Sequence, residues 1–302
     1  MTGQSTIREF EQLFASICER KYCIATGNAS ISILGVCWAM GLTGQQVIVP
    51  AITWPGAITP LQILGCKIIC CDVEDDFLTM DPVKLEALVT PETKAVFSAD
   101  FMGYPCKTDR IAEICRKKKV LYFHDAASAL GSRYKGKQAG YFADVAIYSF
   151  GARKLYSCGE GGAIVYSKSH IHKKLRTQLL HPDRQINEIE NPNWFFFNIS
   201  MNSVIAASNI RRIEKSIRKI REEALRTRKL LGQNIHGESE PNFYKILVKR
   251  KEAFKYKGKF PAGEPVNQKP IYKMLNPKVA KKKFKIAERV NTDYIYLIKQ
   301  SL

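Results

Sequence analysis

Long apolar runs are missing from this sequence: no stretch approaches the ~18 consecutive apolar residues that a membrane-spanning helix needs. The first residues, "MTGQSTIREFEQLF", are polar and acidic, whereas a secretory signal peptide is basic and then apolar. Hydrophobic residues make up 45% of the 302 residues and charged residues 25%, which is typical of globular proteins. We therefore expect a cytoplasmic globular protein without a membrane partner.

Paired cysteines are missing as well. The chain has nine cysteines, an odd number, and no two of them form a CxxC pair. Zinc sites and disulfide frameworks usually show regular cysteine spacings. We expect neither a bound metal nor a disulfide framework, and we expect most of the cysteines, which lie in apolar segments, to be small core residues.

Acidic residues are scarce relative to basic ones. The chain has 28 Asp and Glu against 47 Lys and Arg, which gives a formal net charge of +19. Residues 211–302 hold 25 of the basic residues and only 9 of the acidic ones. Such a segment is typical either of a protein with an anionic partner (nucleic acid, a membrane surface or a phosphorylated small molecule) or of a plain solvated surface.

Short apolar runs rich in β-branched residues alternate with helical patterns over the first two thirds of the chain. The apolar runs predict buried strands at 45–50, 66–73, 94–101, 119–127, 144–150 and 162–167. The helical patterns lie at 28–42, 56–65, 81–89 and 107–119, and Asp81 followed by Pro82 is a typical helix start. This alternation predicts an α/β domain with a mostly parallel sheet.

The pattern changes near residue 203. Isoleucines at helical spacing predict one continuous helix up to Gly232, and two strand-like pieces follow at 242–250 and 294–299. A Lys- and Pro-rich stretch separates these two pieces, and the sequence shows no internal repeats. We predict a large α/β domain over residues 1–210 and a small, strongly basic C-terminal α+β domain over residues 211–302.

Polar and small residues follow several of the predicted strands directly. Thr53 and Trp54 follow the first strand, Asp125 ends the fourth and Ser149 ends the fifth. The small-residue turn "ATGNAS" at 25–30 follows the apolar piece "KYCI" and opens a helix. Because ligands of parallel α/β sheets bind at the carboxyl ends of strands, we expect these residues to meet at one edge of the sheet.

Each of these residues suits one part of a pyridoxal phosphate site. The turn binds phosphate through the free N–H groups of a helix start, Trp54 stacks on a flat ring, and Asp125 holds a protonated pyridine nitrogen. Lys154 lies 29 residues after Asp125, and a buried lysine forms a Schiff base with an aldehyde. Taken singly, the turn is more often an ordinary helix start, the tryptophan a core or rim residue and the lysine a structural or solvated one, and Asp125 would also suit a helix N-cap. Their combination favours the cofactor site.

Residues 149–162, "SFGARKLYSCGEGG", fit the pattern S-F-x-x-x-K-x-x-x-x-G-E-G-G without a gap. Upstream, "HDAASALGSRYKGKQAGYFADVAIYSF" follows the order D-A-A-Q-A-L-G … K-G … G … D-V … S-F. On these motifs the sequence resembles the DegT/DnrJ/StrS family of pyridoxal-phosphate-dependent sugar aminotransferases over about residues 3–230. The resemblance implies the aspartate-aminotransferase-like fold, fold type I of the PLP-dependent transferases: a mostly parallel central sheet with helices on both faces, plus a small C-terminal α+β domain.

The resemblance also implies a role for each matching position. Lys154 would form the Schiff base with the cofactor and later move a proton, and Asp125 would keep the ring nitrogen protonated. Trp54 would stack on the ring, and Ser128 stands where the family usually has Gln or His near the cofactor. The remaining cofactor-binding positions would be Gly27, Asn28, Ala29 and Ser149, which hold the phosphate, and Asn198, which reaches it across a homodimer interface with shared active sites.

Lys154 also predicts the type of reaction, because a dehydratase branch of the family carries His at this position. The implied reaction is ping-pong amino transfer. An amino acid, for which we expect glutamate, leaves its amine on pyridoxal 5'-phosphate, and a nucleotide-linked keto-sugar then collects it. The basic C-terminal segment would help to hold the diphosphate of that nucleotide.

Departures from the family pattern leave alternatives open. Ser200 stands where the family usually has Arg, and Asn28 where it usually has Thr. The match begins only after the family's first few tens of residues, and the C-terminal segment lacks a recognisable sugar-binding stretch. The alternatives are another pyridoxal phosphate reaction on the same scaffold and a protein that binds the cofactor without turnover. We expect no nucleic-acid partner, because the basic segment lacks interleaved aromatic residues.

Overall fold

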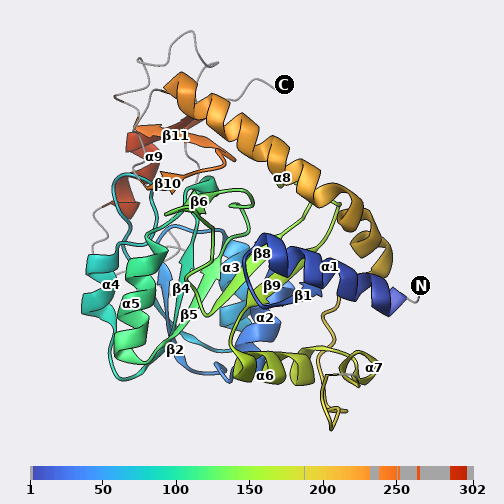
Figure 1. Cartoon of the computed structure of the whole chain (residues 1–302). Helices are drawn as coiled ribbons and strands as arrows, with labels where there is room; N and C mark the ends of the chain where they lie inside the picture. Colours follow the sequence, from blue (N-terminus) through green and yellow to red (C-terminus); the bar gives the residue numbers. More distant parts are fainter. Residues whose placement is uncertain are drawn as a thin grey trace.

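The computed structural model describes residues 3–186, 188–231, 238–249, 251, 264–265 and 286–297. Its centre is a seven-stranded sheet with the strand order β1-β9-β8-β5-β4-β2-β3 (Figure 1). The strands are β1 Tyr22–Thr26, β2 Gln46–Pro50, β3 Lys67–Cys71, β4 Thr93–Ala99, β5 Leu121–Asp125, β8 Val145–Ser149 and β9 Gly162–Tyr166. Only β9 runs antiparallel to its neighbours, so the prediction of a mostly parallel sheet is confirmed.

Helices cover both faces of this sheet, as predicted. Helices α2 (Ala29–Ala39), α3 (Pro55–Ile63) and α6 (Ser169–Leu179) contribute buried residues to the core on one face. On the other face, α4 (Pro82–Leu88) and α5 (Thr108–Lys118) pack at one end, and α1 (Gly3–Ile17) and α8 (Ser203–Leu231) pack at the other. Alternate residues of one strand face opposite cores: Val47 and Val49 pack beneath α3, and Ile48 packs beneath α4 and α5.

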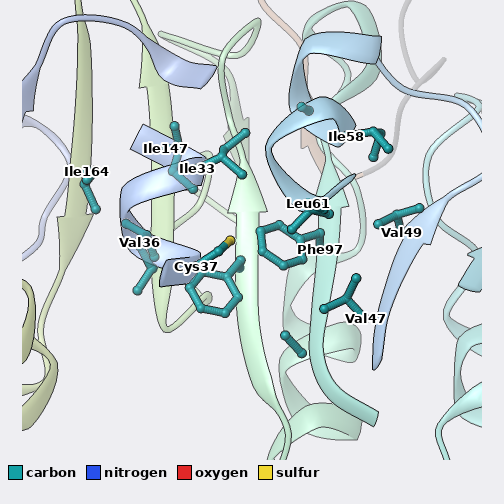
Figure 2. Close-up of a cluster of buried hydrophobic side chains, with 14 of the residues drawn as sticks. Ile33, Val36, Cys37, Val47, Val49, Ile58, Leu61, Phe97, Ile147 and Ile164 are labelled. Atoms are coloured by element: carbon teal, nitrogen blue, oxygen red, sulfur yellow. The ribbon is translucent and has the colours of Figure 1, made fainter. Parts of the chain in front are cut away.

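The core under α2 and α3 shows why the strands are apolar throughout. Figure 2 shows Ile33 and Val36 of α2 facing the sheet residues Ile147 and Ile164. The rings of Phe97 and Phe123, on neighbouring strands, stack with their centroids 4.7 Å apart. Full burial of one such side chain contributes roughly 1.5–3 kcal/mol, so a strand that is buried on both faces needs an unbroken apolar run.

The sequence prediction does not include helix α1. Its buried residues Ile7, Phe10 and Phe14 are spaced at one helical face, and they pack against the sheet and against α8. Phe14 meets Tyr148 of β8 edge to face with the ring centroids 5.1 Å apart. Most of the polar residues between these positions are exposed or half-buried, and Glu11 is the buried exception, which is why the stretch reads as polar in the sequence.

The C-terminal part contains short elements. Strands β11 (Ile246–Lys249), β13 (Tyr294–Leu297) and β12 (Glu264–Pro265) form an antiparallel sheet, and β10 (Ser239–Glu240) joins β6 (Arg133–Tyr134) and β7 (Lys137–Gln138) in another. The remaining elements are α7 (Pro182–Gln185), α9 (Val290–Asp293), η1 (Phe101–Gly103) and η5 (Ala287–Arg289).

The predicted division at residue 210 falls inside α8, which is continuous from Ser203 to Leu231. The two-domain division therefore stays a prediction. Most of the Lys- and Pro-rich stretch between β11 and β13 lies outside the described residues.

The hydrophobicity of the helices and the burial of the cysteines can be compared with the sequence predictions. None of the helices in the described part of the chain is long and apolar enough to cross a membrane. All nine cysteines carry free thiols, and seven of them are buried, which confirms that most are core residues.

Candidate active site

A pocket of about 480 Å³ opens at the carboxyl edge of the central sheet. It is lined by residues that follow four strands: Thr53 and Trp54 after β2, Asp100 and Met102 after β4, Asp125 and Ser128 at and after β5, and Arg153 and Lys154 after β8. Tyr244, far along the chain, closes one side. The volume lies within the roughly 300–1,000 Å³ that is usual for small-molecule sites. The pocket thus brings Thr53, Trp54, Asp125 and Lys154 together at the strand ends, with Ser128 beside them, and their roles toward a cofactor stay predictions.

Lys154 points its amine into this pocket region and donates to the Ser128 hydroxyl at 3.2 Å. The Nζ atom also lies 5.7 Å from the centre of the Tyr244 ring. Burial lowers the pKa of the Lys154 amine; the Asp125 carboxylate opposes this change and the Arg153 guanidinium adds to it. A lysine with a lowered pKa holds more of its amine in the uncharged, nucleophilic form, which is what attack on an aldehyde requires.

Asp125 ends β5, and its Oδ1 atom accepts a hydrogen bond from the Ala127 N–H at 2.9 Å. No α-helix begins here in the described structure, so the carboxylate caps a turn and not a helix. Burial raises the pKa of Asp125, whereas the Ala127 N–H and the charges of Lys154 and His124 lower it. A partly buried carboxylate at the pocket wall suits a cationic partner such as a protonated ring nitrogen.

Trp54 is 59% exposed and lines the pocket, so it is not a core tryptophan. The Arg153 guanidinium lies 5.5 Å from the centre of its ring. The Ser30 hydroxyl of α2 donates to the Gly56 carbonyl at 2.9 Å, and this contact joins the start of α2 to the turn that carries Trp54. An exposed indole at the wall of a pocket is suited to stacking on a flat ring.

The predicted phosphate turn lies at the start of α2 but outside the pocket lining. The Asn28 side chain caps the helix by accepting from the Ile31 N–H at 2.9 Å, and the Gly27 N–H donates to the Ile199 carbonyl at 3.0 Å. Ser149 is also outside the lining, and its hydroxyl accepts from the Gly151 N–H at 3.4 Å. The roles of Gly27, Asn28, Ala29 and Ser149 therefore stay predictions.

Gly162 connects this turn to the lysine motif. It pairs with Thr26 of β1 on one side and with Ser149 of β8 on the other. A Cβ atom at Gly162 would lie 2.8 Å from the Asn28 carbonyl carbon and 3.0 Å from the Ala29 nitrogen. The last glycine of "GEGG" therefore allows the turn to lie directly against β9. With the amine, the carboxylate and the indole, this close-packed helix start is a set of groups that fits pyridoxal phosphate.

Asn198 is exposed and lies outside the pocket lining, and its Oδ1 atom accepts from the Ser200 N–H at 3.1 Å. Ser200, where the family pattern has Arg, accepts from the Arg184 guanidinium at 2.8 Å. A guanidinium therefore does lie at this position, but it comes from α7.

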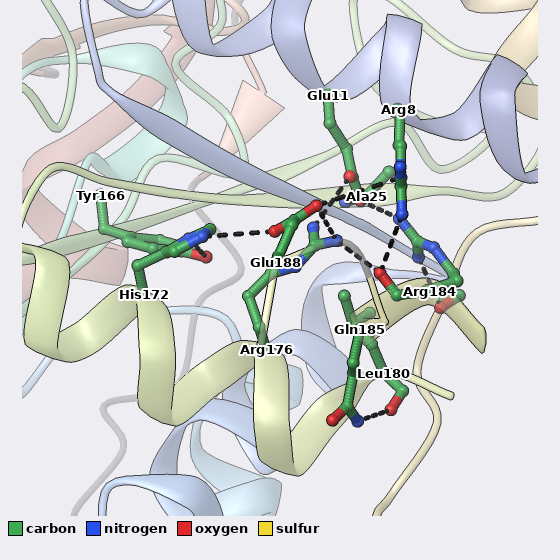
Figure 3. Close-up of polar contacts among 11 residues, drawn as sticks. Arg8, Glu11, Ala25, Tyr166, His172, Arg176, Leu180, Arg184, Gln185 and Glu188 are labelled. Carbon is green, nitrogen blue, oxygen red and sulfur yellow. Dashed lines mark hydrogen bonds and ion pairs between the residues drawn. The ribbon is translucent and has the colours of Figure 1, made fainter. Parts of the chain in front are cut away.

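Arg184 belongs to a buried charge network next to the strand that leads into the Gly27–Ala29 turn. Figure 3 shows the Glu11 carboxylate facing both Arg184 and Arg176, at 2.7 and 3.3 Å. The same carboxylate accepts from the Ala25 N–H of β1 at 2.9 Å. This network ties helices α1, α6 and α7 to the end of β1, two residues before Gly27.

Sequence reasoning did not identify Arg153, Asp100 or Tyr244 as pocket residues. Asp100 lies inside the predicted strand 94–101, and it follows a strand only because β4 ends at Ala99; Arg153 lies inside the lysine motif. Tyr244 lies neither at the end of a predicted strand of the central sheet nor in the lysine motif, so the sequence does not mark it as a pocket residue. Its hydroxyl donates to the Arg153 carbonyl at 2.9 Å, a contact between residues 91 positions apart.

Comparisons with known proteins agree with this site. The family model described as the DegT/DnrJ/EryC1/StrS aminotransferase family matches residues 1–281. GDP-perosamine synthase of Caulobacter vibrioides is 34% identical over 216 residues, which are 69% of this chain and 56% of that protein. GDP-perosamine synthase of Escherichia coli O157:H7 is 28% identical over 247 residues, 79% of this chain and 67% of that protein. The chain thus spans little more than half the length of the Caulobacter relative.

The fold is also shared with solved structures. The structure of a DegT DnrJ EryC1 StrS aminotransferase from Brucella abortus matches 97% of this chain and 84% of its own, with a TM-score of 0.81 and 19% sequence identity. At this level of identity the match establishes the fold, and it confirms the predicted fold class.

Proposed function

We infer that this chain, which belongs to the DegT/DnrJ/EryC1/StrS aminotransferase family, is a pyridoxal-phosphate-dependent aminotransferase. We propose that it moves an amino group from an amino acid, glutamate, to a keto-sugar carried on a nucleotide, in two ping-pong half-reactions. The observation that carries this proposal is the Lys154 amine, which lies in the strand-end pocket together with Asp125 and has a lowered pKa.

Each residue of the pocket has its own role in the proposed reaction. When bound, pyridoxal phosphate supplies an aldehyde that carries the amino group and a ring that withdraws electrons. Lys154 holds the cofactor and moves a proton with its Nζ atom, and Ser128 orients that amine at 3.2 Å. Asp125 holds the proton on the ring nitrogen, and Trp54 covers one side of the site. Gly27, Asn28, Ala29 and Ser149 are proposed to hold the phosphate.

The nucleotide-linked substrate is supported by the two curated relatives, both named GDP-perosamine synthase. Arg153 and Lys245 place two positive charges in the wall of the pocket, where a substrate carboxylate or diphosphate would enter. Positive charges at the entrance raise the local concentration of anionic substrates.

The proposed active unit is a homodimer in which Asn198 of one copy reaches the cofactor phosphate of the other. Its exposure and its position outside the lining of the pocket in its own chain support this assignment. The neighbouring Trp194 and Phe195 are 73% and 89% exposed, which suits a segment that a second copy covers. We propose a cytoplasmic enzyme, and we keep residues 1–210 and 211–302 as its proposed domains.

The decisive experiment is a visible absorption spectrum of the purified protein with pyridoxal phosphate, before and after glutamate is added. We expect a new visible band in the wild type, no such band in Lys154→Ala, and loss of the band when glutamate donates its amine. Lys173→Ala is the matched control, because Lys173 is exposed on α6 and lies outside the pocket lining.

The other outcomes separate the alternatives. A band that no amino acid removes would support a protein that binds the cofactor without turnover. A band that glutamate removes and that no nucleotide-linked keto-sugar restores would favour another substrate class on the same scaffold. The absence of any band in the wild type would refute the proposal.

A further inference from the structure

Two aspartates end neighbouring strands at the floor of the pocket. Ala99 of β4 pairs with Asp125 of β5, so Asp100 follows one residue beyond that pair. The Asp100 N–H donates to the Asp125 carbonyl at 3.0 Å, and both residues belong to the pocket wall. Two neighbouring carboxylates, one buried and one partly buried, destabilise each other's ionised form unless a cation compensates one of them. The negative charge of Asp100 does raise the pKa of Asp125.

His124 lies where such a cation is needed. Its Nε2 atom is 2.9 Å from Asp100 Oδ2, and both side chains are fully buried. Its Nδ1 atom is 2.6 Å from the Ser98 hydroxyl, which in turn lies 2.7 Å from the Tyr122 hydroxyl. The second Asp100 oxygen accepts from the Cys106 N–H at 2.9 Å. Hydrogen bonds thus fix His124 Nδ1 and Asp100 Oδ1, whereas Nε2 and Oδ2 lie at ion-pair distance from each other without the geometry of a hydrogen bond.

The surroundings favour the charged form of the imidazole. Burial lowers the pKa of His124, but the Asp100 carboxylate and the Cys106 thiol together raise it by more, and the pKa lies well above its ordinary value. The other titratable groups near the ring are the Cys106 thiol, 3.8 Å from Nδ1, and the Tyr122 hydroxyl. Burial raises the pKa of both groups, so both are neutral near pH 7. Asp100 is therefore the anion that His124 pairs with.

A metal site at Asp100, Cys106 and His124 explains these contacts less well, although the three residues offer suitable ligand atoms. One ring nitrogen faces the carboxylate and the other is hydrogen-bonded to Ser98, so a metal at the ring would displace either the ion pair or the Ser98 hydrogen bond. The contacts describe a buried ion pair whose outer atoms, His124 Nδ1 and Asp100 Oδ1, are each fixed by a hydrogen bond.

We propose that His124 is a positioning residue: its charge neutralises Asp100 and thereby leaves Asp125 as the carboxylate whose charge faces Lys154 and the ring nitrogen of the cofactor. This inference rests on the proposed function, because it assigns Asp125 to that nitrogen. It explains how the site holds two neighbouring aspartates while only one of them acts on the cofactor.

The test compares His124→Gln, Asp100→Asn and the double variant in titrations with pyridoxal phosphate. His124→Gln keeps an N–H donor toward Asp100 but removes the charge. We expect it to weaken cofactor binding about tenfold, which corresponds to a change of about one pKa unit in the site. Asp100→Asn alone is expected to stay within about threefold of the wild type, and adding it to His124→Gln is expected to restore binding. Ser98→Ala is the matched control, because it removes a hydrogen bond from the same ring without changing a charge.

Two outcomes would overturn the inference. If the double variant binds as weakly as His124→Gln, or if His124→Gln binds normally and only unfolds more easily, His124 has a structural role alone. A second measurement uses the wild-type protein and so does not depend on the folding of a variant. Nitrogen NMR of the histidines is expected to show that the His124 imidazole stays protonated up to pH 8. A neutral His124 at pH 7 would refute the proposal. A wild type that does not bind pyridoxal phosphate would refute the proposed function instead, since the NMR result reports the charge of His124 independently.

Discussion

The glycines of "GEGG" offer a sharp test of how the cofactor side of the site is built. Gly162→Ala would place a Cβ atom 2.8 Å from the Asn28 carbonyl carbon, 2.8 Å from Thr26 Oγ1 and 3.0 Å from the Ala29 nitrogen. Two of these neighbours are backbone atoms, which cannot rotate away as a side chain does. The start of α2 must therefore move relative to β9.

Gly159 is the matched comparison in the same motif. Its φ is +90°, and a Cβ atom there would meet nothing within 4 Å. Gly159→Ala therefore costs only the backbone strain of a left-handed residue, roughly 1–2 kcal/mol. Overpacking at Gly162 costs roughly 1–3 kcal/mol, so the two variants are expected to lose similar stability. They should differ in cofactor binding, because only Gly162→Ala displaces the proposed phosphate turn.

The assay is a pair of measurements on each variant: the free energy of unfolding in urea, and the dissociation constant of pyridoxal phosphate from its visible spectrum. We expect Gly162→Ala to bind the cofactor at least about tenfold more weakly, which is about 1.4 kcal/mol, and Gly159→Ala to bind it as the wild type does. Equal cofactor affinities in the two variants, with equal losses of stability, would refute the placement of the phosphate at this turn.

Four further predictions concern the lysine, the indole and the buried network. Because the pKa of Lys154 in the folded protein is below its ordinary value of 10.5, covalent capture of the cofactor should quicken with rising pH around a midpoint below 10.5, and a midpoint at or above that value would contradict the buried amine. The same shift should make this group's contribution to stability increase with pH between the folded pKa and 10.5, because the unfolded chain binds more protons there. Trp54→Ala should weaken cofactor binding by about 0.5–1.5 kcal/mol in a spectroscopic titration, whereas Trp38→Ala, which removes an indole that contacts Phe197, should not. Arg184→Ala should lower the free energy of unfolding by about 3 kcal/mol in urea, because it leaves part of the Glu11 charge buried without its partner; a loss below about 1 kcal/mol would show that Arg176 alone compensates Glu11.

The strands and the lysine motif were predictable because local chemistry decides them. Parallel strands buried on both faces require continuous apolar runs, and the predicted run at 144–150 contains β8, Val145–Ser149. The residues that end such strands reach one edge of the sheet whatever else the chain does. For this reason the sequence suffices to assign Asp125, Trp54 and Lys154 to one pocket, and the folded chain does bring them together there.

Other features depend on distant parts of the chain meeting. Glu11 and Arg184 lie 173 positions apart, and no local pattern relates them. Helix α1 reads as a polar segment until its apolar face meets α8 and the sheet. Asn28 was predicted from its position in the turn, but its side chain caps α2, a role that depends on the backbone geometry of the helix start.

The sequence alone determined the α/β architecture, the strand-end convergence and the identity of the lysine, because these follow from apolar periodicity and from one gapless motif. Only the tertiary structure decided which partner each buried or pocket charge meets: Arg184 meets Glu11 and Ser200, Arg153 lies beside the Trp54 ring, and His124 meets Asp100. The physical reason is that the energy of a buried charge depends on its nearest countercharge and on the exclusion of water. Both depend on how the folded chain packs, and local sequence patterns do not specify either of them.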